Sequence, residues 1–121
     1  MRILVDMDDV IGKLTHREII LSVILLKPGN GNFVVEDLKK GLDSVVHESP
    51  RLDIPWSSIS NTLFFYHPYL CGELNLPEYR LSYEGRKIIQ KEFDTYSPKT
   101  QQRLREITEK VWHYFLDGQE N

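Results

Sequence analysis

Three aspartates near the start of this chain are the first residues whose types and spacing could do chemistry. Asp6, Asp8 and Asp9 follow the apolar run 3–5. A carboxylate at the end of a strand can share a hard cation such as Mg²⁺ or act as a nucleophile. Apolar residues in 1–13 also recur at helical spacing, which favours a helix there. The alternative to a catalytic group is therefore a solvated acidic edge on an N-terminal helix or strand.

Small polar side chains in the segment 55–67 are the second candidate group. They are Ser57, Ser58, Asn61 and Thr62. Hydroxyl groups can hydrogen-bond phosphates or bases, and an amide can bind adenine through two hydrogen bonds. No Lys or Arg lies between Pro55 and Leu70, so positive charge has to come from elsewhere. Small polar residues opposite an apolar stripe are also typical of any solvated helix face.

Composition and spacing argue against several other classes of site. The four histidines are far apart, without the short spacing of a metal site, and the single Cys71 permits neither an intrachain disulfide nor a cysteine-rich zinc site. The longest apolar run, 19–26, is too short to span a bilayer, and the acidic N-terminus does not resemble a signal peptide. We therefore expect a cytoplasmic protein that uses no cofactor and no metal and does not enter a membrane.

Local signals predict a mostly helical α+β chain of 121 residues that forms a single domain, 1–121. Thr15 and Glu18 form a capping box at the start of a helix, and Pro55, Ser82 and Ser97–Pro98 mark further helix starts. The run 33–35 is either a short strand or the lead-in to a helix. The predicted elements are helices from Thr15 to about 26, 35–46, 55–67, 83–95 and 98–116, and a hairpin of 71–76 with 79–81 across Pro77–Glu78.

The stretch Tyr79-Arg-Leu-Ser-Tyr-Glu-Gly-Arg-Lys resembles the exit from the wing of winged helix-turn-helix domains, where Leu-[Ser/Thr]-x-x-Gly-[Arg/Lys] is common. The order of three helices, a hairpin and a helix is similar to that core over residues ~15–95. Segment 55–67 then occupies the recognition-helix position, and the C-terminal helix, ~98–116, lies outside the resemblance. The loop 47–54 is longer than the turn of a simple helix-turn-helix.

This resemblance implies a small DNA-binding protein without catalysis, acting as a transcriptional regulator on double-stranded DNA. A net charge of −3 is unusual for a protein that neutralises phosphates. The alternative is a winged-helix module that binds another protein through the aromatic residues near 56–69. The implied nucleic-acid contacts are Lys39, Lys40, Arg51, Ser57, Ser58, Asn61, Thr62, Arg80, Arg86 and Lys87.

An apolar stripe on the last helix predicts a homodimer interface, because terminal helices outside such a core often pair across a two-fold axis. The alternative is that this helix covers its own domain. The stripe consists of Leu104, Ile107, Val111, Tyr114 and Phe115.

Residues 3–10 also resemble the first motif of haloacid-dehalogenase-like phosphohydrolases. That resemblance implies Asp6 as a phosphoryl-accepting nucleophile and Asp8 as a general acid/base beside Mg²⁺. The rest of the chain lacks the second acidic pair and the alternating strands and helices of that family. We therefore rank a phosphohydrolase third, behind both binding functions, and expect no enzyme activity.

Overall fold

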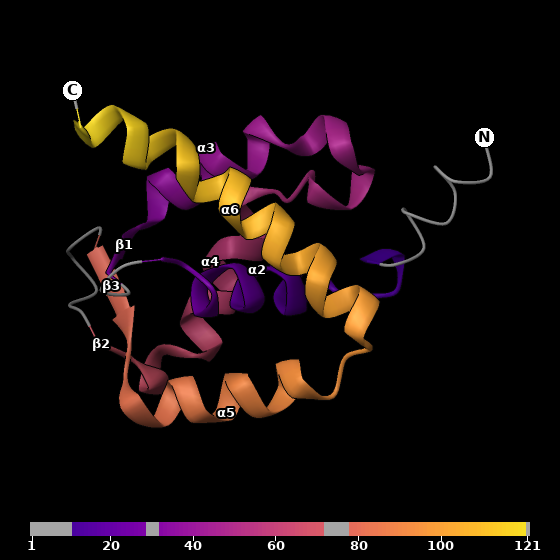
Figure 1. The fold of residues 1–121 in the computed structure, drawn as a ribbon. Coiled ribbons are helices and arrows are strands. Elements are labelled where there is room, and N and C mark those ends of the chain that lie inside the picture. The colour runs from indigo at the N-terminus through magenta and orange to yellow at the C-terminus, as the bar shows by residue number, and fades with distance from the viewer. Residues whose placement is uncertain (1–10, 29–31, 72–77, 121) are drawn as a thin grey trace.

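The computed structural model describes residues 11–28, 32–71 and 78–120, and it is a mostly helical α+β structure, as the sequence predicts (Figure 1). Short 3₁₀ turns at Val46–Glu48 (η1), Pro50–Leu52 (η2) and His67–Tyr69 (η3) connect the longer elements. The helices are α2 (His16–Leu25), α3 (Val35–Ser44), α4 (Trp56–Phe65), α5 (Tyr83–Asp94) and α6 (Pro98–Glu120), and the strands are β1 (Phe33–Val34), β2 (Leu70–Cys71) and β3 (Glu78–Leu81).

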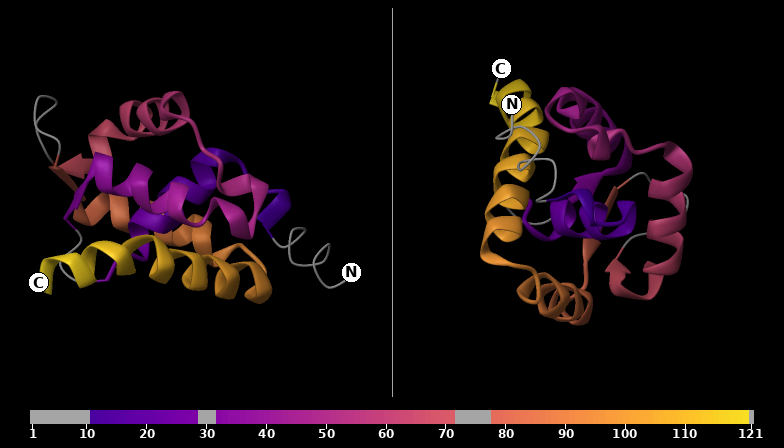
Figure 2. Two further views of the ribbon diagram at one scale, coloured as in Figure 1. Left: turned by 90° about the horizontal axis from the view of Figure 1, so that it is seen from above. Right: turned by 90° about the vertical axis from the view of Figure 1, so that its right-hand side faces the viewer.

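Helix α2 lies at the centre of the structure, and every residue from Ile19 to Leu25 is buried. Its start follows the predicted capping box: the Glu18 amide donates to Thr15 Oγ1 over 3.1 Å, and the Thr15 amide donates to Glu18 Oε1 over 2.8 Å. Helices α4, α5 and α6 all contact α2. The right-hand view of Figure 2 shows α6 and α4 on opposite sides of α2.

The three short strands form one small antiparallel arrangement in the order β1-β3-β2. The predicted hairpin is confirmed in the pairing of β2 with β3, where Leu70 faces Leu81 and Cys71 faces Arg80. Residues 72–77 lie outside the described residues, and Glu78 belongs to β3 rather than to a turn. Segment 33–35 serves both predicted roles, because β1 pairs with β3 immediately before α3 begins.

Helix α4 differs from its prediction at its N-terminal end. Pro55 is the residue before the helix and not its first turn, and Trp56 remains 47% exposed. The helix packs on α2 through Ile59, which is completely buried, and through Thr62. Trp56 therefore lies outside the buried face of α4, and the outer face of this helix carries aromatic side chains.

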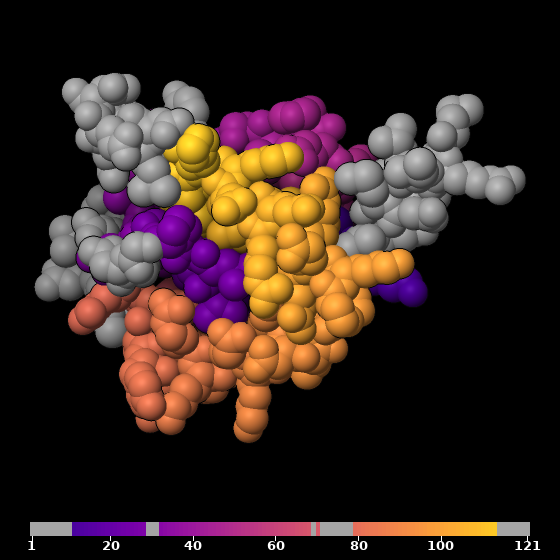
Figure 3. Space-filling view, viewed as in Figure 1, coloured from indigo at the N-terminus to yellow at the C-terminus, as the bar shows by residue number. Residues whose placement is uncertain are grey.

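The apolar stripe of α6 packs within its own chain. The predicted homodimer interface is therefore wrong for three of its five residues. Leu104, Ile107 and Val111 are all completely buried, and α6 packs along α3 and α2. Figure 3 shows α6 lying across this face between α3 and α5. These three side chains cannot contact a second copy without opening the core. The side chains of Tyr114 and Phe115 lie outside the described part, and dimerisation stays a prediction.

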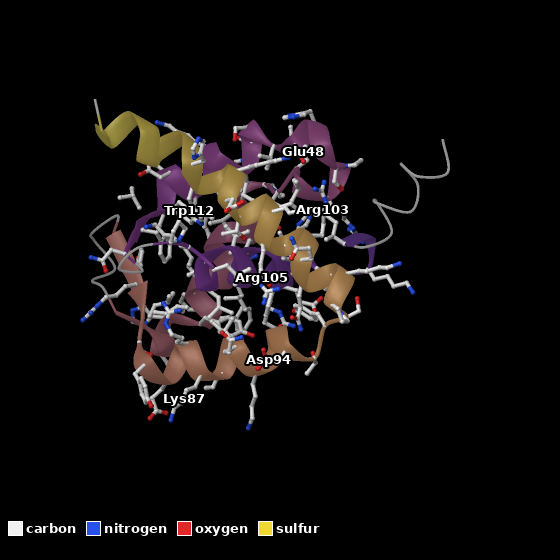
Figure 4. All side chains as sticks on the ribbon, viewed as in Figure 1. Glu48, Lys87, Asp94, Arg103, Arg105 and Trp112 are labelled. Carbon is white, nitrogen blue, oxygen red and sulfur yellow. The ribbon has the colours of Figure 1, made fainter. Side chains whose placement is uncertain are left out.

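Polar contacts at two places, around Trp112 and around Glu48, fix α6 to the elements beside it (Figure 4). The indole nitrogen of buried Trp112 donates to the Val23 carbonyl of α2 over 3.0 Å. Glu48 of η1 accepts from Lys110 over 2.9 Å and from Arg103 over 3.3 Å. The hydrogen bond from Lys110 and the two positive charges outweigh burial and lower the pKa of the Glu48 carboxyl.

The close approach of α3 and α6 at Gly41 predicts that replacing this glycine with alanine destabilises the fold. A Cβ at Gly41 would lie 2.5 Å from Val111 Cγ1 and 2.5 Å from the Val111 carbonyl oxygen. Overpacking of this kind costs about 1–3 kcal/mol and opposes the stability normally gained from Gly→Ala in a helix. We expect Gly41→Ala to lower the free energy of unfolding in urea titrations. Gly12→Ala is the matched control, because a Cβ there meets nothing within 4 Å; equal stability of the two variants would contradict this packing.

The lowered pKa of Glu48 predicts a pH-dependent contribution to stability. A carboxyl whose pKa is lower in the folded state stabilises the fold above its unfolded pKa, and that stabilisation is lost as pH falls through the folded value. At pH 7 we expect Glu48→Gln to unfold more easily than wild type by about 1–2 kcal/mol. Below about pH 4 the difference between the two proteins should shrink. A difference that stays constant from pH 7 to pH 3 in urea titrations would exclude this ion pair as its source.

Candidate nucleic-acid interface

A shallow hollow of about 410 Å³ runs between the first turn of α2 and helix α4. The segment that leads into α4 contributes one wall through η2. The hollow is lined by Thr15, His16, Arg17, Arg51, Ser58, Asn61, Thr62 and Phe65.

Hydrogen bonds hold the cationic side chains of the hollow in place. Arg51 Nε donates to the Gly12 carbonyl over 2.9 Å, and its Nη2 donates to the same oxygen. Arg17 Nη1 donates to the Tyr66 hydroxyl over 3.2 Å. Both arginines are exposed, so their remaining N–H groups can reach a ligand.

No described residue that lines the hollow carries a carboxylate. Glu18 is on the same turn of α2, but its carboxylate accepts from the Thr15 amide and from the Tyr96 hydroxyl. Burial, together with the charges of Glu18 and Glu92, raises the pKa of Tyr96, so this hydroxyl stays a donor. The hollow therefore combines two guanidinium groups with hydroxyl and amide groups, which is a chemistry suited to an anion.

Helix α4 presents a continuous exposed face beside this hollow. Ser57, Ser60, Asn61 and Phe64 follow one another at helical spacing and are all exposed. Phe64 is 75% exposed, Phe65 is 76% exposed, and their rings meet edge to face with centroids 6.4 Å apart. Helix α4 lies on the opposite side of α2 from α6 (Figure 2).

Four of the predicted contact residues come together at the hollow: Arg51, Ser58, Asn61 and Thr62. Thr62 is nevertheless a poor contact, because it is 5% exposed and its hydroxyl donates to the Ser58 carbonyl over 2.8 Å. The Ser58 hydroxyl is half-buried and hydrogen-bonded to His16 Nδ1 at 3.1 Å. Arg51 and Asn61 are the exposed pair of this set, and Ser57 lies exposed on the same helix.

The two lysines predicted on α3 do not line the hollow. Lys39 forms an ion pair with Asp43 at 2.8 Å, one turn further along the helix. Lys40 is exposed on α3. Of these two lysines, Lys40 is the one that forms no ion pair with a described residue.

The three predicted contacts on the wing side form a separate group on β3 and α5. Arg80 is exposed on β3. Arg86 donates from Nη1 to the Leu25 carbonyl at the end of α2, over 3.3 Å, and so helps to join α5 to α2. Lys87 Nζ lies 4.5 Å from the centre of the Tyr83 ring on the outer side of α5 (Figure 4).

Sequence reasoning missed Arg17, His16 and the exposure of Phe64. The sequence signal at Thr15–Glu18 is a capping box, which predicts where a helix begins and not which element its first turn will face. Arg17 and His16 reach α4 only because α2 and α4 pack together. No local pattern carries that information.

Asp6 and Asp8, which would be catalytic in the third-ranked phosphohydrolase alternative, lie outside the described residues. Within 11–28, 32–71 and 78–120, no group of three or more His, Cys, Asp or Glu side chains is arranged to hold a metal ion. In the same part of the chain, no helix combines the length and apolar character needed to cross a lipid bilayer.

Comparison with protein-family models, curated proteins and solved structures gave no match to this chain.

Proposed function

We propose that this chain is a winged helix-turn-helix protein that binds double-stranded DNA and regulates transcription. The order of elements supports this proposal: α2, α3 and α4 precede the hairpin of β2 and β3, and α5 follows directly. In such an arrangement α4 occupies the position of the recognition helix. Its outer face is open to solvent along its length, as a helix that enters a major groove requires.

The observation that carries the proposal is the hollow beside α4, where Arg17 and Arg51 lie exposed and none of the described lining residues is a carboxylate. Phosphate contacts supply most of the affinity of DNA-binding proteins, and arginine is well suited to them. Because α4 itself has no Lys or Arg, these two residues provide the positive charge next to it. The net charge of −3 is a property of the whole chain, whereas binding depends on this local surface.

The proposed contacts divide into two kinds. Arg17 and Arg51 bind phosphates and fix the orientation of α4, and Ser57 and Asn61 face the base edges. Lys40 on α3 and Arg80 on β3 are further exposed cations that can reach flanking phosphates. Lys39 and Thr62 are less suitable, because the charge of Lys39 is paired with Asp43 and Thr62 is buried. Arg86 is exposed, but it belongs to the separate group on β3 and α5 and does not line the hollow.

Charge reversal in the hollow tests the proposal. We expect Arg51→Glu and Arg17→Glu each to weaken binding to a fluorescent duplex by at least ~10-fold at about 100 mM salt. Each variant should also reduce the slope of log affinity against log salt by about one. The measurement is fluorescence anisotropy over a series of salt concentrations, with circular dichroism to confirm that each variant is folded.

Lys99→Glu is the matched control, since it reverses one exposed charge on α6. Helix α6 lies on the opposite side of α2 from α4 (Figure 2). The Lys99→Glu variant should bind DNA as wild type does. Folded Arg51→Glu and Arg17→Glu proteins with wild-type affinity, or an equal loss in Lys99→Glu, would reject the hollow as the DNA-binding surface.

A second candidate function is binding of another protein through α4. The specific observation is the exposure of Phe64 and Phe65, because large exposed apolar side chains often mark interaction surfaces. A module of this kind shows no salt-dependent affinity for DNA. If it binds a second copy of itself, light scattering gives a dimer mass that Phe64→Ser returns to a monomer. A homodimer that survives this change would have to use a different surface.

A further inference from the structure

The exposed face of α4 lacks the side chains that most often bind guanine. Arg and Lys bound to O6 and N7 of guanine are the commonest specific contact in the major groove. The exposed residues of α4 include neither. They are Trp56, Ser57, Ser60, Asn61, Phe64 and Phe65.

The same face does carry the two side-chain types that suit an A·T base pair. An asparagine amide can bind N6 and N7 of adenine together, and an apolar side chain can contact the methyl group of thymine. Asn61 and Phe64 supply these two chemistries. They are three residues apart, so their Cβ atoms lie about 5–6 Å apart on one helix face. Successive base pairs rise by about 3.4 Å, so the two side chains can serve the same or neighbouring base pairs.

Arg17 and Arg51, which lie beside α4, indicate what kind of molecule binds to its exposed apolar face. Phe65 lines the same hollow as Arg17 and Arg51, so the aromatic end of α4 and the positive charge form one surface. A DNA duplex offers phosphates to the two guanidinium groups and, next to them, thymine methyl groups to the aromatic end of the helix. Phe64, 75% exposed, would exchange contact with water for contact with those methyl groups.

We infer that α4 selects A·T base pairs in the major groove, with Asn61 bound to adenine and Phe64 against the thymine methyl. This inference rests on the proposed DNA-binding function. Arg17 and Arg51 contribute affinity for DNA of any sequence. Asn61 and Phe64 contribute the preference for A·T base pairs. Ser57 tolerates either type of base pair, because a hydroxyl can donate or accept.

The test compares three duplexes of equal length that differ only in a central block of A·T, G·C or inosine·cytosine pairs. Inosine·cytosine presents the groups of G·C in the major groove but lacks the guanine amino group in the minor groove. Contacts of α4 in the major groove therefore predict strong binding to the A·T duplex and binding weaker by ~10-fold or more to both of the others. Equal strong binding to the A·T and inosine·cytosine duplexes would overturn the inference, because it would place recognition in the minor groove.

A second measurement tests the contact between Phe64 and the thymine methyl group alone. Replacement of thymine by deoxyuridine removes only the methyl group, and we expect it to weaken wild-type binding by ~3–10-fold. The same replacement should have no effect on Phe64→Ala, whose core is intact because Phe64 is exposed. Ser60→Ala, on the same exposed face, is the matched control and should respond to deoxyuridine as wild type does.

The outcomes separate this inference from the function on which it rests. Salt-dependent binding with equal affinity for all three duplexes, or a deoxyuridine effect that persists in Phe64→Ala, would reject the selection of A·T pairs and leave DNA binding in place. No binding to any duplex at low salt would reject the proposed function itself.

Discussion

The burial of α2 on all sides from Ile19 to Leu25 is the constraint on which the rest of the structure depends. A helix at the surface of a protein buries one face, but α2 buries every residue from Ile19 to Leu25. Each large apolar side chain buried there contributes about 1.5–3 kcal/mol. Helices α4, α5 and α6 must therefore all pack around α2, and this requirement fixes α4 on one side and α6 on the other (Figure 2).

The position of the candidate interface follows from this arrangement. The capping box of Thr15 and Glu18 begins α2 just before its buried stretch, so Arg17 lies on the exposed first turn. Helix α4 packs on α2 through Ile59, which turns Asn61 and Phe64 to solvent. The hollow forms where these two elements meet, and η2 adds Arg51 to it. Structural packing and the proposed binding surface thus have the same origin.

The sequence predicted those features that local signals determine. Ser82 accepts from the Gly85 amide at the start of α5, and Ser97 accepts from the Thr100 amide at the start of α6, as their spacing indicates. Periodicity also located the helices within a few residues. Other features depend on contacts between residues distant in sequence, and no local pattern encodes them. They are the pairing of β1 with β3, the exposure of Trp56 and the approach of Arg17 to α4. An apolar stripe such as Leu104, Ile107 and Val111 shows that a face is buried, but not whether the partner is its own chain.

The central claim is that α4 and the first turn of α2 together form a DNA-binding surface. Amide chemical-shift changes measured by NMR during titration with a DNA duplex test this claim residue by residue. The account predicts changes concentrated at Arg17, Arg51, Asn61 and Phe64, with little change at Lys99 on α6. Changes confined to α5 or α6, or no changes at all at low salt, would contradict it.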